Sequence, residues 1–202
     1  NDTVYGAMFI VSNIAAVAVN IVGVKQCFKE GTLVACLDED GNETQLPIEK
    51  IAVGTLVLAY DEATGEKEYK PVVQLFRNTT KQWYHIFVNG KEIICTGGHP
   101  FYVLNAESDR DIVIYEGTHS NTKGKWIEAR KLKISDKVLF SNGTCAIIDS
   151  IKVEKLDSFE TTYNFEIENF HTYFVGVNKI LVHNACGVES SNDIVQFESQ
   201  GK

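Results

Sequence analysis

The chain has 202 residues, 44% of them hydrophobic and 23% charged, so it is long and apolar enough to bury a core of its own. Its formal net charge of −8 argues against a protein that binds nucleic acid or anionic membranes, because neither would meet a basic surface. Five cysteines without a C-x-x-C pair are too few for a disulfide scaffold and predict no structural zinc site, and their odd number leaves at least one without a partner in the chain.

The first segment differs from the rest of the chain. Residues 6–24 carry no charge and lie between Asp2 and Lys25. This length approaches that of a membrane span, yet serine and asparagine interrupt the run, and the basic start of a signal peptide is missing. We therefore predict an apolar helix that belongs to a larger parent protein and packs against another part of it, with a membrane-associated segment as the alternative. The compartment stays open.

From Cys27 onward, short runs of β-forming residues alternate with turn residues. The clearest signal is a pair of runs at 83–88 and 91–95 joined by Asn89-Gly90, a dipeptide that suits a type I′ hairpin turn. Further runs lie at 32–37, 55–60, 71–76, 100–104, 136–140, 145–153, 163–167, 171–177 and 179–182. Because no long amphipathic helix accompanies them, the pattern predicts an all-β domain of short strands. Residues 105–124 are the most polar stretch and predict a long surface loop or insertion.

Four places along this β region carry groups that could do chemistry. They are Cys27, the loop Thr96-Gly97-Gly98-His99 after a predicted strand, His171, and the pair His183-Asn184 after the last strand. Each alone has an ordinary explanation. A cysteine is often a packing residue, glycines often make a tight turn, and a histidine is often structural. Cys36, Cys95 and Cys145 lie on β runs and are expected to be core residues.

Together and in this order, these residues resemble the Hint superfamily of hedgehog and intein self-processing domains. The similarity is strongest to the bacterial intein-like domains of secreted multidomain proteins and polymorphic toxins. The matching segments are CFKEGTLV (27–34), PIEKIAVGTLVLAYDEATGE (47–66), TGGHPFYV (96–103), KWIEARKLKISDKVLF (125–140) and YNFEIENFHTYFVGVNKILVHN (163–184). The resemblance implies a minimal, horseshoe-like, pseudo-two-fold β domain at 27–184 without a homing endonuclease, and flanks at 1–26 and 185–202 that are its substrates.

The resemblance gives the first chemical step to Cys27. Its side chain can attack the carbonyl of Gln26 through a five-membered ring, an N–S acyl shift that exchanges an amide for a thioester. Backbone distortion and protonation of the departing nitrogen would drive this step, and an imidazole whose pKa lies near neutrality suits the protonation. By resemblance His99 is that acid, and Thr96 hydrogen-bonds the scissile peptide.

The second step is expected at Asn184, whose side-chain amide can attack its own carbonyl carbon, form a succinimide and release Ala185. A primary amide is a poor nucleophile, so orientation matters, and placement within one molecule contributes on the order of 7–11 kcal/mol when the geometry is favourable. The resemblance implies that His183 polarises the carbonyl and that His171 assists proton transfer.

Two residues depart from the pattern of splicing inteins. Ala185, directly after the terminal asparagine, has no nucleophile to accept the acyl group, and Cys186 stands one residue too far for the same ring geometry. Asn164 occupies a position that is often aspartate, so it can form hydrogen bonds but carries no charge. We therefore expect cleavage at Gln26–Cys27 and Asn184–Ala185, with splicing minor or absent. Water or an external thiol or amine would resolve the thioester.

Other functions remain as alternatives. They are inefficient true splicing, a hedgehog-type transfer of the acyl group to a lipid, an inactive Hint-like β module that acts as a spacer or binding domain, and a Cys-His protease acting in trans. The His183-Asn184 pair argues against the hedgehog type and the protease. No cofactor, metal or nucleic acid is expected, the domain is expected to be a monomer, and zinc is a plausible inhibitor through Cys27.

Overall fold

A computed structural model describes residues 26–107, 110 and 123–184. The apolar helix predicted for 1–26 lies outside these residues except for Gln26, as do the flank 185–202 and most of the loop predicted at 105–124. Within the described part, no helix is long and apolar enough to cross a membrane.

The described residues form β-strands and two short 3-10 helices, which confirms the all-β prediction. The strands are β1 (Leu33–Leu37), β2 (Glu43–Pro47), β3 (Leu56–Tyr60), β4 (Lys67–Val88), β5 (Lys91–Cys95), β6 (Pro100–Val103), β7 (Lys125–Glu128), β8 (Lys137–Leu139), β9 (Cys145–Ile167), β10 (Thr172–Val175) and β11 (Ile180–His183). The helices are η1 (Ile48–Lys50) and η2 (Ala129–Lys131).

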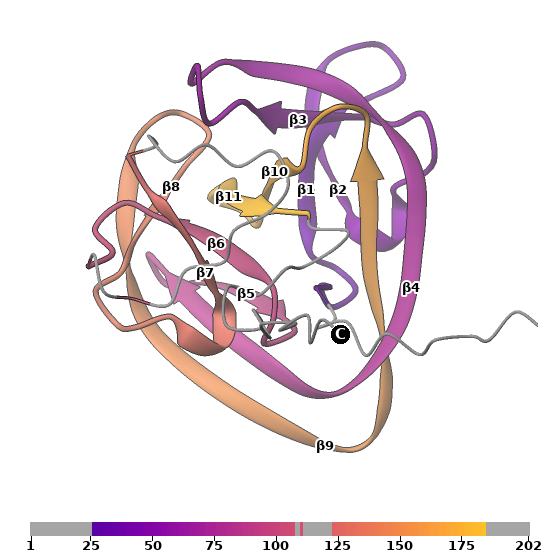
Figure 1. Ribbon diagram of the computed structural model, residues 1–202. Coiled ribbons are helices and arrows are strands. Elements are labelled where there is room, and N and C mark those ends of the chain that lie inside the picture. Colours follow the sequence, from indigo (N-terminus) through magenta and orange to yellow (C-terminus); the bar gives the residue numbers. More distant parts are fainter. Residues whose placement is uncertain (1–25, 108–109, 111–122, 185–202) are drawn as a thin grey trace, which may run out of the picture.

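The strands pair antiparallel in the order β10-β11-β6-β8-β9-β4-β3-β1-β2, with β5 attached to β4 and β7 to β6. Val34 of β1 also pairs with Val175 of β10, so the series of pairings returns to its start. Figure 1 shows β4 and β9 curving around the outside while β10 and β11 lie inside the curve. This outline agrees with the horseshoe-like shape that the resemblance implies. Both ends of the described chain therefore reach the interior of the curve.

Two strands are much longer than the sequence pattern predicts. The runs at 71–76 and 83–88 belong to the single strand β4, and those at 145–153 and 163–167 belong to β9. The polar residues between the runs stay paired because β4 and β9 pair with each other over nearly their whole length, with register shifts that absorb the mismatch. The short strands β2 and β7 lie outside the runs predicted from the sequence, because neither contains a long run of β-forming residues.

The hairpin prediction is confirmed. Asn89 and Gly90 have φ angles of +50° and +66°, as a type I′ turn requires, and β4 pairs with β5 directly on either side of them. This register delivers Cys95 and the loop at 96–99 to the interior.

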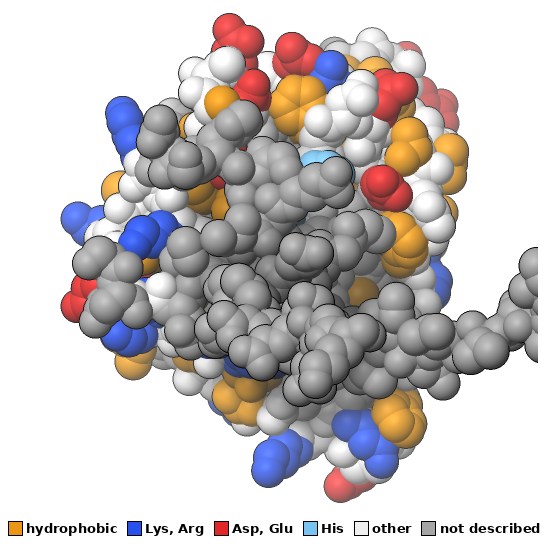
Figure 2. Space-filling view, viewed as in Figure 1, with side chains coloured by type: hydrophobic (Ala, Val, Ile, Leu, Met, Phe, Trp, Pro, Cys, Tyr) orange, Lys and Arg blue, Asp and Glu red, His pale blue; other side chains and the backbone are white. Residues whose placement is uncertain are grey.

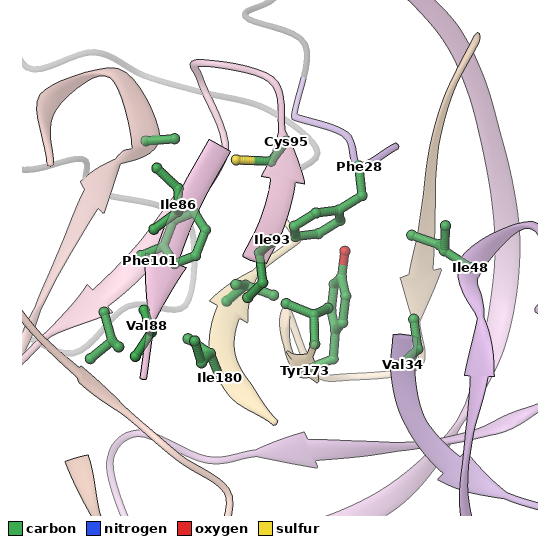
Figure 3. Packing of buried hydrophobic residues seen from close by; sticks show 14 of the residues in the cluster. Phe28, Val34, Ile48, Ile86, Val88, Ile93, Cys95, Phe101, Tyr173 and Ile180 are labelled. Carbon is green, nitrogen blue, oxygen red and sulfur yellow. The ribbon is translucent and has the colours of Figure 1, made fainter. Parts of the chain in front are cut away.

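Buried apolar side chains from most strands fill the space inside the curve. Figure 3 shows Phe28, Ile93 and Tyr173 packed against one another there, and the rings of Phe28 and Tyr173 meet edge to face with centroids 6.3 Å apart. Phe28 is fully buried, so it anchors the start of the domain in the core.

The cysteines divide between the core and the surface. Cys36 and Cys95 are buried free thiols whose pKa values are raised by burial, as expected of core residues. The same prediction for Cys145 is wrong, because this thiol at the start of β9 is exposed.

The face drawn in Figure 2 carries lysine and arginine side chains mainly along its left and lower edges and acidic side chains mainly at its top.

Candidate functional site

Thr96 binds the backbone of Cys27 at both its nitrogen and its carbonyl oxygen. Its hydroxyl oxygen accepts a hydrogen bond from the Cys27 backbone N–H at 3.0 Å and its backbone N–H donates to the Cys27 carbonyl at 2.9 Å. Cys27 itself is 2% exposed. The nitrogen of the Gln26–Cys27 bond is thus fixed by a side chain from the loop that follows β5.

This loop is held close to its neighbours on both sides. A Cβ on Gly97 would come within 2.7 Å of the Tyr84 ring, so the absence of a side chain at this position permits the close approach. Residues of η2 also donate to the loop, Ala129 to the His99 carbonyl at 2.8 Å and Arg130 to the Gly97 carbonyl at 2.9 Å. The loop therefore presents Thr96 and His99 on a rigid frame.

His99 is fully buried and packs against Phe28, with ring centroids 4.0 Å apart. Burial lowers the pKa of His99 to about 3, and the nearby Gln26 carbonyl opposes this shift only in part. Both ring nitrogens are buried without a fully formed hydrogen bond among the described residues. The expected pKa near neutrality is therefore wrong, because a charged imidazolium loses its hydration in this apolar pocket. At neutral pH the ring is uncharged and close to the carbonyl of Gln26.

The other end of the domain closes on the same interior. His183 is buried at the end of β11, between the Trp126 ring at 4.9 Å and the half-buried His171 ring, which stacks on it at 5.9 Å. Burial lowers the pKa of His183 well below its usual value, and the nearby His171 and His99 lower it further. The three histidines therefore share one region of the interior.

Asn164 joins the two ends. Its Nδ2 donates to the Gln26 carbonyl at 2.6 Å and to Asn184 Oδ1 at 3.1 Å. Its Oδ1 accepts from the Phe165 N–H at 2.9 Å and from the Tyr173 hydroxyl at 2.8 Å. Since a backbone N–H can only donate, the orientation of this amide is fixed, and Nδ2 must face both ends.

Asn184 is held equally firmly. It is 1% exposed, its backbone N–H donates to the His171 carbonyl, and its Nδ2 donates to the Phe165 carbonyl. Both the oxygen and the nitrogen of its side-chain amide are therefore hydrogen-bonded to residues of β9. The residues beyond it, Ala185 and Cys186, lie outside the described part of the chain.

The structure thus gathers every candidate residue that it describes around one interior site. These residues are Gln26, Cys27, Thr96, His99, Asn164, His171, His183 and Asn184. Sequence reasoning missed Tyr173, which orients Asn164, and Trp126, which packs on His183. The signal available for Tyr173 in the sequence was its position in the matching segment 163–184, two residues after His171. No group of three or more potential metal ligands occurs in the described ranges, and inhibition by zinc stays a prediction.

Comparison with known proteins gives one family and one fold. The pretoxin HINT domain family matches residues 40–108 and 106–185. The solution structure of a bacterial intein-like domain from Clostridium thermocellum is 32% identical and superposes with a TM-score of 0.65, covering 79% of this chain and 99% of the other. None of the curated proteins compared with the chain matches it.

More distant inteins share the fold. A DnaB intein from Synechocystis sp. PCC 6803 is 17% identical with a TM-score of 0.60, covering 80% of this chain and 99% of the other. The gp41-1 intein is 23% identical with a TM-score of 0.55, covering 78% and 98%.

Proposed function

Because the chain belongs to the Hint family of intein-like domains, whose members process or splice the polypeptide that carries them, we propose that it cleaves its own chain at two bonds. The bonds are Gln26–Cys27 and Asn184–Ala185, at the two edges of the domain 27–184. Each molecule acts once, on itself, so the flanks 1–26 and 185–202 are the substrates.

The first step is an N–S acyl shift at Cys27. The thiolate attacks the carbonyl carbon of Gln26, the carbon–nitrogen bond breaks, and a thioester links Gln26 to the Cys27 sulfur. The thiol proton ends on the freed amine of Cys27. Asn164 Nδ2, 2.6 Å from the Gln26 oxygen, stabilises the negative charge that develops there during the attack.

His99 moves the proton between the two atoms. Its neutral ring accepts the proton that the thiol loses. Once protonated, an imidazolium with a pKa of about 3 is a strong acid and passes the proton to the departing nitrogen of Cys27. His99 thus carries the proton only during the reaction, because burial keeps its ring neutral at rest.

The second step is the cyclisation of Asn184. Its Nδ2 attacks its own carbonyl carbon, a succinimide forms, and the amine of Ala185 leaves with the proton that Nδ2 gives up. His183 and His171 are the groups nearest to handle this proton, since their stacked rings lie at the end of β11 beside Asn184. The nucleophile is already immobilised by Phe165 and Asn164, which lowers the entropic cost of the reaction.

Cleavage is proposed as the main outcome because Ala185 offers no side chain to accept the acyl group from the thioester. Water, or an external thiol or amine, would then take the acyl group of Gln26. The observation that supports self-processing best is the shared contact of Asn164 with Gln26 and Asn184, since it brings both proposed cleavage sites into one hydrogen-bond network.

Trapping the thioester tests the proposal. In a chain carrying Asn184→Ala, hydroxylamine near neutral pH should release residues 1–26 ending in a hydroxamate at Gln26, together with a fragment that begins at Cys27. Mass spectrometry identifies both products. Release at another bond, or no release under native conditions, would contradict the first step.

A further inference from the structure

The sulfur of Cys27 lies above β9. Phe28 exchanges two backbone hydrogen bonds with Tyr163, at 2.8 and 2.9 Å, so the segment that carries Cys27 follows one side of β9. β4 pairs along the other side of β9, and from there the Nδ2 of Asn78 comes within 4.0 Å of the Cys27 sulfur. The side chains of Cys27 and Asn78 therefore meet across the strand between them.

Thr162 is the residue of β9 beneath this contact. It pairs directly with Asn78, and because strand side chains alternate, it shares a face with Asn164, two residues further on. Cys27 lies on that same face, because its neighbour Phe28 pairs with Tyr163. The Thr162 side chain is 0% exposed, and its hydroxyl is buried without a hydrogen-bond partner among the residues that the structure describes.

We propose that the Thr162 hydroxyl, which has no hydrogen bond at rest among the described residues, donates one to the Cys27 sulfur as the thiol ionises and attacks Gln26. This inference rests on the proposed first cleavage step. The hydroxyl gives its hydrogen bond to the sulfur but keeps its proton, so the route of the thiol proton through His99 is unchanged.

The division of labour among the neighbours supports this role. Asn164 donates to the oxygen of Gln26, and Thr96 accepts from the nitrogen of Cys27. Asn78 lies within 4.0 Å of the Cys27 sulfur, and Thr162 pairs directly with Asn78 on the same face. Such a donor has no existing hydrogen bond to break when it turns toward a new charge. The new hydrogen bond therefore stabilises the transition state without stabilising the resting state. A purely structural role fits poorly, because a buried hydroxyl without a partner lowers stability.

The test compares hydroxylamine-dependent release of residues 1–26 in full chains that carry Asn184→Ala. Thr162→Val keeps the shape and removes the hydroxyl, and it should slow release by about tenfold to a hundredfold. The pH at which the rate reaches half its maximum should also rise by about one unit, because the thiolate loses a donor. Thr162→Ser restores a hydroxyl and should restore most of the rate.

Thr161→Val is the matched control, since Thr161 is exposed on the other face of β9, and this variant should keep the parent rate. Urea unfolding should show Thr162→Val to be as stable as its parent or more so. A Thr162→Val chain with the parent rate and pH profile overturns the inference, as does an equal loss in Thr162→Val and Thr162→Ser. If Cys27→Ala still abolishes release in those cases, the proposed function stands without Thr162. If release does not depend on Cys27, both fail.

Discussion

Replacing Cys27 by alanine is expected to abolish the release of residues 1–26 by hydroxylamine or thiols, with a fall in rate of at least roughly 10³-fold. The reason is that no other described thiol can take its place. Cys36 and Cys95 are buried with raised pKa values, and Cys145 is exposed on the start of β9. Cleavage after Asn184 should continue in the variant, because the alanine leaves the second nucleophile intact.

The matched control is Cys145→Ala, which removes an exposed thiol outside the site and should release residues 1–26 at the rate of the parent chain. Time courses followed by intact-mass spectrometry compare the two variants directly. A Cys27→Ala chain that is still cleaved at Gln26–Cys27 would show that the bond breaks without a thioester.

Replacing Asn164 by leucine is expected to slow cleavage at both ends, by roughly 10²- to 10³-fold at Gln26–Cys27. The change removes the donor to the Gln26 oxygen and the donor that holds Asn184 Oδ1. Few single substitutions should affect two bonds so far apart in the chain. Rates measured separately in Asn184→Ala and Cys27→Ala backgrounds resolve the two effects.

Leucine also leaves buried polar groups unpaired at a cost of about 1–3 kcal/mol each, so a second variant is needed to separate chemistry from folding. Asn164→Asp keeps the shape and the oxygen that accepts from Phe165 and Tyr173, but an ionised carboxylate cannot donate. It should cleave slowly where the carboxyl is ionised and should recover as the carboxyl protonates. Full activity of Asn164→Asp at a pH where the carboxyl is ionised would exclude donation by Nδ2 as the cause.

The sequence contained enough to place the amino-terminal half of the site. The Asn89-Gly90 turn fixes the β4–β5 register, and that register determines where the loop at 96–99 emerges. Local conformational preferences act over a few residues there, so the chain of inference from turn to strand to loop is short. The predicted strands at β1, β3, β6, β10 and β11 follow from runs of apolar residues that are buried in the fold.

The hydrogen-bond link between the two ends of the domain could not be predicted in this way. In the sequence Asn164 stands out only as a departure from a pattern, yet it contacts Gln26 and Asn184 because β9 runs past both ends of the domain. That path depends on the long β4–β9 pairing, whose polar middle gives no local signal for a strand. The neutral state of His99 was likewise hidden, since its pKa depends on burial against Phe28 and not on its own loop.

We expect the two ends of the domain to react at one site and the flanks to separate without being joined. The test is an intact-mass spectrum of the full chain after incubation with and without a thiol such as dithiothreitol. We predict fragments 1–26, 27–184 and 185–202, with the second ending in a succinimide at Asn184, and faster release of 1–26 with the thiol. A product in which residues 1–26 are joined to 185–202 would show splicing and would overturn the proposal that cleavage is the main outcome. A chain that stays whole under both conditions would contradict self-processing itself.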